Sequence, residues 1–267
     1  MKRTKAIIIA AAALAALLTG CGKSEAEQVA DIYGFFAKDT TIRDSYEKIN
    51  RVCPKRTAGL PGSYDIIDYF TMMADRCNAG ADVKFFELKS GRGRDILIEI
   101  PGKLKDRITL VAAAADTWSD SLSVRNDDLG CIAAFEVLNA YRSLRIKPEN
   151  TIRILLYQSM GNSMEGLQPY LDYSLPKDEE HIMQMFLTSD EKGPRKLFTV
   201  GEPPRIYNTF MKVIPPLFEG YGEYAFERGG QRHEGWNLKA PLYRYNIDRE
   251  DAANDIAAVV SLIVLMN

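Results

Sequence analysis

The segment ITLVAAAA, residues 108–115, decides the fold class of this chain, because it is apolar at seven of its eight positions. A short run of this kind is typical of a strand that is buried on both faces of a parallel sheet. The segment TIRILLY, residues 151–157, has a similar character. The two segments predict the centre of a sheet.

Further strands and helices are predicted on both sides of these segments. The strands cover 83–88, 95–100, 182–187, 196–200 and 240–245. The helices, marked by apolar residues at every third or fourth position, cover 41–51, 64–78, 129–144, 206–217 and 250–266, with a helix or turn at 164–173. Because strands alternate with helices, we expect an α/β fold with three αβα layers and a mostly parallel, mixed central sheet.

The beginning of the chain predicts an export signal. Lys2, Arg3 and Lys5 precede an apolar run at 6–18, which is shorter than the ~20 residues that span a bilayer. The sequence LTGC that ends at Cys21 resembles the bacterial lipobox, which implies cleavage before this cysteine and acylation of its thiol. An ordinary cleaved signal followed by a chance cysteine is the alternative.

These features divide the chain into three parts. We expect a lipoprotein signal peptide at 1–20, a tether and N-terminal segment at 21–40, and a single domain at 41–267. Residues 23–27, KSEAE, are predicted to be a short solvated tether. The protein is therefore expected to be exported to the bacterial cell envelope, at the outer membrane, and held on the membrane by two or more acyl chains.

The composition limits the function. The chain has 34 Lys and Arg residues and 36 Asp and Glu residues. It therefore lacks the excess of basic residues that would indicate a nucleic-acid partner. Zinc sites rely on His and Cys, yet the histidines are only His181 and His233, and no C-x-x-C pair occurs. Cys53 and Cys77 could form a disulfide, whereas Cys131 lies in an apolar helical stretch and is expected to be buried.

Several segments resemble, in order and spacing, the co-catalytic zinc aminopeptidases. This family, metallopeptidase family 28, also includes glutamate carboxypeptidases and glutaminyl cyclases. The resemblance runs from about residue 41 to the C-terminus and implies a zinc-exopeptidase fold. The segments that carry it are RTAGLPG (56–62), DILIEIPG (95–102), ITLVAAAADTW (108–118), NDDLG (126–130) and RILLYQSMGNSMEGLQPY (153–170).

The resemblance also implies where a zinc site would lie. The family holds two zinc ions with two His, a bridging Asp, a Glu and an Asp, and a second Glu is the general base. Here Ala114 stands at the first His position, and Met160 and Gly161 stand at the Glu pair. The bridging Asp would be Asp127 or, after a register shift of one residue, Asp128. Ala114, Met160 and Gly161 therefore mark a degenerate site.

The remaining positions of the site are also incomplete. Asp116 is kept, but in the family it supports a ligand, and Asp190 is a candidate for the later Asp. The final His has no counterpart, and His233 resembles an earlier element of the family that is not a ligand. No metal or other cofactor is therefore expected, although the family would bind zinc.

Each remnant has a second interpretation. Asp116 is either held by backbone hydrogen bonds or part of a new polar pocket, and Asp127 and Asp128 could simply favour the start of a helix. A residual Ca or Mg site is a further alternative. Its ligands would be Asp116, Asp120, Asp127, Asp128 and Asp190, and Glu165 could replace the lost Glu only after the loop is remodelled. The aromatic residues that would line either a cleft or the core are Trp118, Trp236, Tyr221, Tyr224, Tyr243 and Tyr245.

These observations favour a catalytically inactive, aminopeptidase-like lipoprotein that binds a peptide or a protein in the cell envelope. The alternative is a metal-dependent hydrolase of the aminopeptidase type with a rebuilt, non-standard metal site. A third hypothesis is a purely structural component of the envelope.

Overall fold

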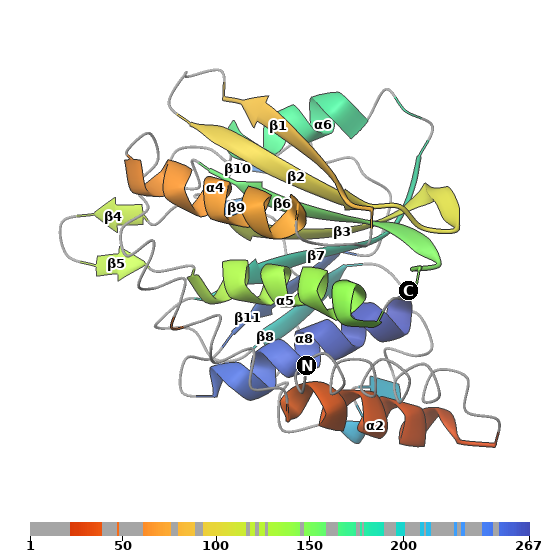
Figure 1. Ribbon diagram of the computed structural model, residues 1–267. Coiled ribbons are helices and arrows are strands. Elements are labelled where there is room, and N and C mark those ends of the chain that lie inside the picture. The colour runs from red at the N-terminus through yellow and green to blue at the C-terminus, as the bar shows by residue number, and fades with distance from the viewer. Residues whose placement is uncertain are drawn as a thin grey trace, which may run out of the picture.

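The apolar run at 108–115 lies almost wholly in strand β3 (Leu104–Ala114), in the interior of a seven-stranded sheet in the computed structural model (Figure 1). The structure describes residues 22–38, 47, 61–75, 80–88, 93–115, 118–120, 123–125, 128–144, 147–158, 165–174, 177, 179–189, 196–200, 209–210, 212–214, 227–228, 231–232, 242–247 and 251–267.

The sheet has a parallel centre and antiparallel edges. Its strand order is β1 (Asp82–Glu87), β2 (Arg94–Ile100), β6 (Asn150–Tyr157), β3, β7 (Glu180–Thr188), β11 (Leu242–Asn246) and β8 (Lys196–Val200). Strands β6, β3, β7 and β11 are parallel neighbours, whereas β1–β2, β2–β6 and β11–β8 are antiparallel pairs. Only β2 and β8 run against the other five strands, so the prediction of a mostly parallel, mixed sheet is confirmed.

Helices cover both faces of the sheet. The alternate residues Val111 and Ala113 of β3 belong to one apolar cluster, which includes helices α4 (Pro61–Asp75), α5 (Asp128–Leu144) and α8 (Ala252–Met266). Leu110, Ala112 and Ala114 belong to a second cluster, with the 3-10 turn η2 (Glu165–Leu167) and helix α6 (Gln168–Ser174). The predicted α/β fold with three αβα layers is confirmed.

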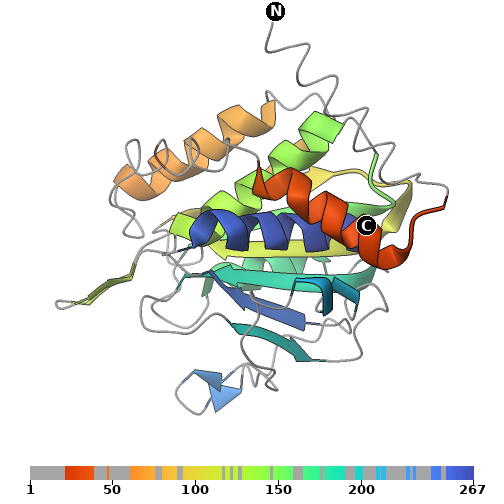
Figure 2. The ribbon, with the colours of Figure 1, turned by 90° about the horizontal axis from the view of Figure 1, so that it is seen from below.

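Helix α2 (Glu25–Ala37) replaces the solvated tether that the sequence predicts at 23–27. The Ser24 side chain accepts a hydrogen bond from the Glu27 backbone N–H, and the Glu27 carboxylate accepts one from the Ser24 backbone N–H. This reciprocal cap satisfies donors at the first turn of the helix. Val29, Ile32 and Phe36 are buried, and α2 lies along α8 (Figures 1 and 2).

The other predicted elements agree to within a few residues wherever they are described. The predicted helix at 64–78 corresponds to α4, and of the predicted helix at 206–217, residues 209–210 and 212–213 are described as helical. The sequence pattern missed two small sheets, which pair β4 (Trp118–Asp120) with β5 (Ser123–Arg125) and β9 (Glu227–Arg228) with β10 (Gln231–Arg232).

Two predictions on the first third of the chain lie outside the described residues. They are the signal peptide with Cys21 and the pairing of Cys53 with Cys77. Within the described part of the chain, no helix is both long and apolar enough to cross a membrane. Cys131 is buried, as its apolar surroundings in the sequence predict.

Candidate functional site

The carboxyl ends of the four parallel strands meet at one edge of the sheet, which we call the carboxyl edge. Ala114 of β3 pairs with Tyr157 of β6, and Ala113 pairs with Leu187 of β7. On the far side of β7, its last residue Thr188 pairs with Asn246 of β11. Ligands of open α/β sheets bind at such an edge, so this is the candidate functional site.

The chain leaves the carboxyl edge immediately before most of the predicted site residues. Asp116 follows Ala114 by two positions, Asp190 follows Thr188 by two, and Met160 and Gly161 come shortly after Tyr157. The strands that precede these positions therefore end at one edge, and the resemblance implies that the positions themselves would lie there. The side chains themselves lie outside the described residues for Asp116, Asp120, Asp127, Asp128, Met160, Gly161, Glu165, Asp190 and His233.

Ala114 ends β3 with a methyl group, at the position where the resemblance implies a zinc-binding His. Its side chain is 1% exposed and lies in an apolar cluster with Leu155 and Tyr157. Its backbone oxygen accepts a hydrogen bond of 2.9 Å from the Cys131 thiol. Since a methyl group has no donor atom, this position cannot bind zinc.

The start of helix α5 is packed directly against the same edge. A Cβ atom at Gly130 would lie 2.8 Å from the Leu187 backbone oxygen, so only glycine allows the helix to approach β7 this closely. Asp128 is the first residue of α5. An acidic residue at this place is favoured by the helix dipole.

The end of β6 is held by tight packing that the sequence analysis missed. Gln158 is fully buried, and its backbone N–H donates a hydrogen bond of 2.8 Å to Asp95 of β2. A Cβ atom at Gly93 would overlap the Gln158 side chain, and one at Gly166 would overlap its backbone. The residue that leads into Met160 and Gly161 is therefore fixed, and small neighbours are required on both sides of it.

Neither the described residues nor their contacts fit a zinc centre at the carboxyl edge. Among the residues for which the structure gives positions, no group of three or more His, Cys, Asp or Glu side chains could hold a metal ion. Tyr245, one of the aromatic residues considered for a cleft, is buried in the core. The side chains of Trp118, Trp236, Tyr221, Tyr224 and Tyr243 lie outside the described part.

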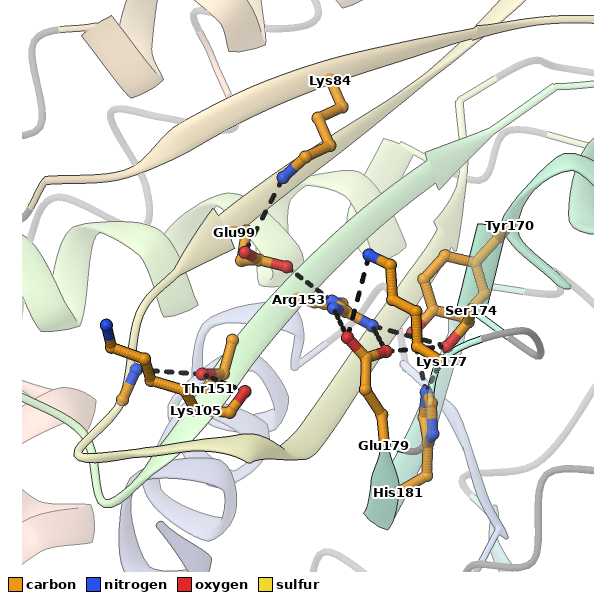
Figure 3. A network of polar contacts seen from close by, with 11 residues as sticks. Lys84, Glu99, Lys105, Thr151, Arg153, Tyr170, Ser174, Lys177, Glu179 and His181 are labelled. Atoms are coloured by element: carbon orange, nitrogen blue, oxygen red, sulfur yellow. Dashed lines mark hydrogen bonds and ion pairs between the residues drawn. The ribbon is translucent and has the colours of Figure 1, made fainter. Parts of the chain in front are cut away.

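His181 lies far from this edge and has another role. It is the second residue of β7, seven positions before Thr188, which corresponds to about 23 Å along a strand. Its Nε2 atom lies 2.8 Å from the Tyr170 hydroxyl and 3.3 Å from the Ser174 hydroxyl (Figure 3). Burial, reinforced by the nearby charge of Arg153, lowers its pKa to about 4. His181 is therefore a neutral residue of the protein interior.

Arg153 organises the polar cluster around His181. Its guanidinium, 2% exposed, makes two hydrogen bonds of 2.6 and 2.7 Å to Glu179 and one of 2.7 Å to Glu99 (Figure 3). Burial alone would lower the pKa of Arg153, but the hydrogen bonds that it donates to Glu179 raise it, so the charge is kept. The same pair holds the pKa of Glu179 below its usual range, despite the opposing effect of burial.

The Arg153 cluster continues to the surface through two lysines. Lys84 lies 3.7 Å from Glu99, and Lys177 lies 3.8 Å from Glu179 and over the ring of Tyr173. The sequence signal for this cluster was a single Arg within the apolar segment TIRILLY. Nothing in the sequence identified its partners, which lie on other strands and in the connection before β7.

Comparisons by sequence identified no relative: no family model matches the chain, and no curated protein matches it. Solved structures do match. The LapA aminopeptidase of Legionella pneumophila superposes with a TM-score of 0.64 and 13% identity, over 90% of this chain and 72% of that chain.

Two structures from Bacteroides thetaiotaomicron match over nearly their whole length. A leucine aminopeptidase precursor has a TM-score of 0.57 and 13% identity, over 84% of this chain and 95% of that one. A glutaminyl cyclase bound to N-acetylhistamine has a TM-score of 0.56 and 14% identity, over 84% and 96%. The chain thus has the fold of the zinc aminopeptidases and glutaminyl cyclases, the fold that its sequence motifs imply.

Proposed function

We propose that the protein is a catalytically inactive, aminopeptidase-like lipoprotein that binds a peptide or a protein at the carboxyl edge of its sheet. The observation that carries the proposal is the buried methyl group of Ala114 at the end of β3. The fold supplies the strand end from which the related enzymes present a metal ligand, but this chain supplies no donor atom there.

The chemistry of the neighbouring positions supports inactivity. A catalytic zinc needs three protein ligands and a water molecule. Met160 and Gly161 stand at the positions of the Glu pair. The Nε2 atom of His181 is hydrogen-bonded to the Tyr170 and Ser174 hydroxyls in the protein interior. Loss of a general base alone slows a reaction by about 100- to 10,000-fold, and missing ligands would also prevent metal uptake.

A peptide is the ligand class that the fold favours. The matching structures are an aminopeptidase, a leucine aminopeptidase precursor and a glutaminyl cyclase. Aminopeptidases act on the N-termini of peptides. A chain that keeps the carboxyl edge without the metal could still bind the N-terminal segment of a peptide. The lipobox-like sequence at Cys21 supports an anchored position in the cell envelope. The balance of acidic and basic residues gives no support for a nucleic-acid partner.

Zinc content and turnover test the proposal directly. Residues 22–267 would be incubated with zinc, desalted, and measured for bound metal and for hydrolysis of a panel of aminopeptidase substrates. An active zinc aminopeptidase of the same fold is the positive control. We expect neither stoichiometric zinc nor turnover. Stoichiometric zinc together with turnover would instead establish the alternative, a hydrolase with a rebuilt metal site.

Binding is tested separately with fluorescent peptides that have free amino termini. The variant Asp128→Lys places a positive charge at the start of α5, beside the carboxyl edge, and Asp82→Lys makes the same change on the exposed edge strand β1. We expect about tenfold weaker binding for the first variant, a change of about 1.4 kcal/mol, and no change for the second. Equal effects of the two variants would place the ligand elsewhere.

A further inference from the structure

The described structure begins at Gly22, one residue after the proposed lipid anchor, and continues through helix α2. The Ser24–Glu27 cap fixes the first turn of α2, and Lys23 forms an ion pair of 2.6 Å with Asp31 on the next turn. Between Cys21 and Lys23 stands only Gly22. Two residues span at most about 7 Å, so a lipid on Cys21 would hold the start of α2 against the membrane surface.

Helix α2 is also firmly attached to the rest of the protein. Val29, Ile32 and Phe36 are buried in the main apolar cluster, and α2 packs on α8. The Glu25 carboxylate accepts a hydrogen bond from the Thr209 hydroxyl. The orientation of α2 therefore sets the orientation of the whole sheet relative to the anchor.

The start of α2 lies at the end of the sheet opposite to the carboxyl edge. Figures 1 and 2 both show the segment that enters α2 at the same end of the molecule as the C-terminal end of α8. That end is tied to the beginning of β6. The Glu149 N–H donates to the Asn267 oxygen at 3.1 Å, and the Asn150 side chain donates to the Asn267 side chain at 3.3 Å. The anchor thus leaves from the amino edge of the parallel strands.

The amino edge carries side chains that suit a lipid headgroup region. Leu104 is 38% exposed, one of two large apolar side chains with this much exposure in the described residues. Lys103, Lys105 and Lys147 are exposed near it. Lys103 is paired with Glu149 at 2.8 Å, and Asp106 is a second acid nearby. Lysines with long apolar stems around one exposed leucine favour the boundary between water and lipid.

We infer that the membrane lies against the amino edge of the sheet, so that the carboxyl edge points away from it into the aqueous space. This inference rests on the lipidation of Cys21 in the proposed function. Strand β6 has eight residues, or roughly 25 Å along the strand. The candidate site is therefore raised about this far above the lipid, and its ligand is a water-soluble peptide or protein segment, not one embedded in the bilayer.

The test uses the full-length, lipidated protein in vesicles of phosphatidylethanolamine and phosphatidylglycerol, with and without brominated acyl chains that quench tryptophan. Leu104→Trp places a probe on the amino edge. Phe85→Trp is the matched control, because Phe85 is 43% exposed on β1, in the middle of a strand. The wild-type chain, with Trp118 in β4 and Trp236, gives the background. Flotation with the vesicles and the mass of the N-terminal peptide establish lipidation, and Cys21→Ser should not float.

We expect the tryptophan at position 104 to lose roughly half of its fluorescence, since interfacial side chains enter the bilayer by about 5–10 Å. The tryptophan at position 85 and the wild-type background should be unchanged. If position 85 or the background is quenched and position 104 is not, the inferred orientation is wrong while the proposed function stands. If Cys21 carries no lipid, both the anchor and the orientation are wrong. Bound zinc with turnover would overturn the proposed function alone.

Discussion

The guanidinium of Arg153 and the carboxylate of Glu179 form two parallel hydrogen bonds, 2.6 and 2.7 Å long, between strand β6 and the residue before strand β7. Arg153 has one further acidic partner, Glu99 of β2, at 2.7 Å. One buried cation thus links three segments on the face of the sheet that α6 covers. Bidentate pairs of this kind combine strength with a fixed geometry.

Replacing the Arg153 guanidinium should show how much these hydrogen bonds contribute to the free energy of unfolding. In Arg153→Met both carboxylates lose their buried partner, and breaking a buried ion pair in this way costs about 3–5 kcal/mol. Since Glu179 and Glu99 are 13% and 19% exposed and can partly regain water, we expect a loss of about 3 kcal/mol. The measurement is the free energy of unfolding in urea.

Arg107→Met is the matched control for that measurement. Arg107 pairs with Glu180 at 3.2 Å, but the two side chains are 40% and 67% exposed. Exposed pairs contribute about 0–1 kcal/mol. Similar losses in the two variants would show that the Arg153 cluster is no more important than a surface pair.

The buried His181 predicts an acid-sensitive stability. Its pKa falls from the ordinary 6.5 to about 4, because burial and Arg153 disfavour the charged ring. Between these two values the unfolded chain takes up a proton and the folded chain does not. The free energy of unfolding therefore decreases as the pH falls from 6.5 to 4, by up to about 3 kcal/mol, and this contribution is constant outside that window.

The variant His181→Gln isolates this effect, because glutamine can hydrogen-bond to Tyr170 and Ser174 without titrating. The free energy of unfolding of both proteins would be measured from pH 4 to pH 8. We expect a flatter curve for the variant between pH 6.5 and pH 4. Parallel curves would mean that His181 does not titrate differently in the two states.

Gly130 tests the contact between α5 and the carboxyl edge. In Gly130→Ala the new methyl group meets the Leu187 oxygen at 2.8 Å, and the helix must move away from β7. We expect a loss of about 1–3 kcal/mol, as in other overpacked sites, measured by urea unfolding. Gly34→Ala in α2 has no atom within 4 Å of the new group, and it should be neutral or stabilising by up to ~1 kcal/mol. Matching effects would contradict the close contact.

Ile32 tests whether α2 is part of the folded structure. Its side chain is fully buried, so Ile32→Ala should lower the free energy of unfolding by about 2–5 kcal/mol. Leu104→Ala, at a site that is 38% exposed, should cost less than about 1 kcal/mol. If Ile32→Ala were equally mild, α2 would be attached only loosely, and the inferred orientation on the membrane would lose its support.

The central strands could be predicted from the sequence because buried strands consist mostly of apolar residues. The run at 108–115 is short and apolar at seven of its eight positions, which favours a strand buried on both faces of a sheet, and 151–157 has a similar character. The order of the strands could not be predicted in this way, because β6 lies between β2 and β3 although it follows both in sequence. Strand order depends on pairings between distant segments, which no local pattern reports.

Positions of the candidate site could be predicted only where they fall within a sequence motif. Ala114 was identified at the end of β3, and the structure gives this position a buried methyl group within an apolar cluster. The Arg153 cluster was missed, because its partners are separated by 26 and 54 positions. Helix α2 was missed although Ser24 and Glu27 have capping spacing, because its acidic first turn resembles a solvated segment.

The contact between α2 and α8 has a consequence for how the chain assembles. Helix α2 ends at Ala37 and helix α8 begins at Ala252, so 215 positions separate them in the sequence. Closing so large a loop is slow and entropically costly, and it cannot occur until nearly the whole chain is available. In a chain that is synthesised from its N-terminus onward, the layer that α2 and α8 form would therefore be among the last to assemble.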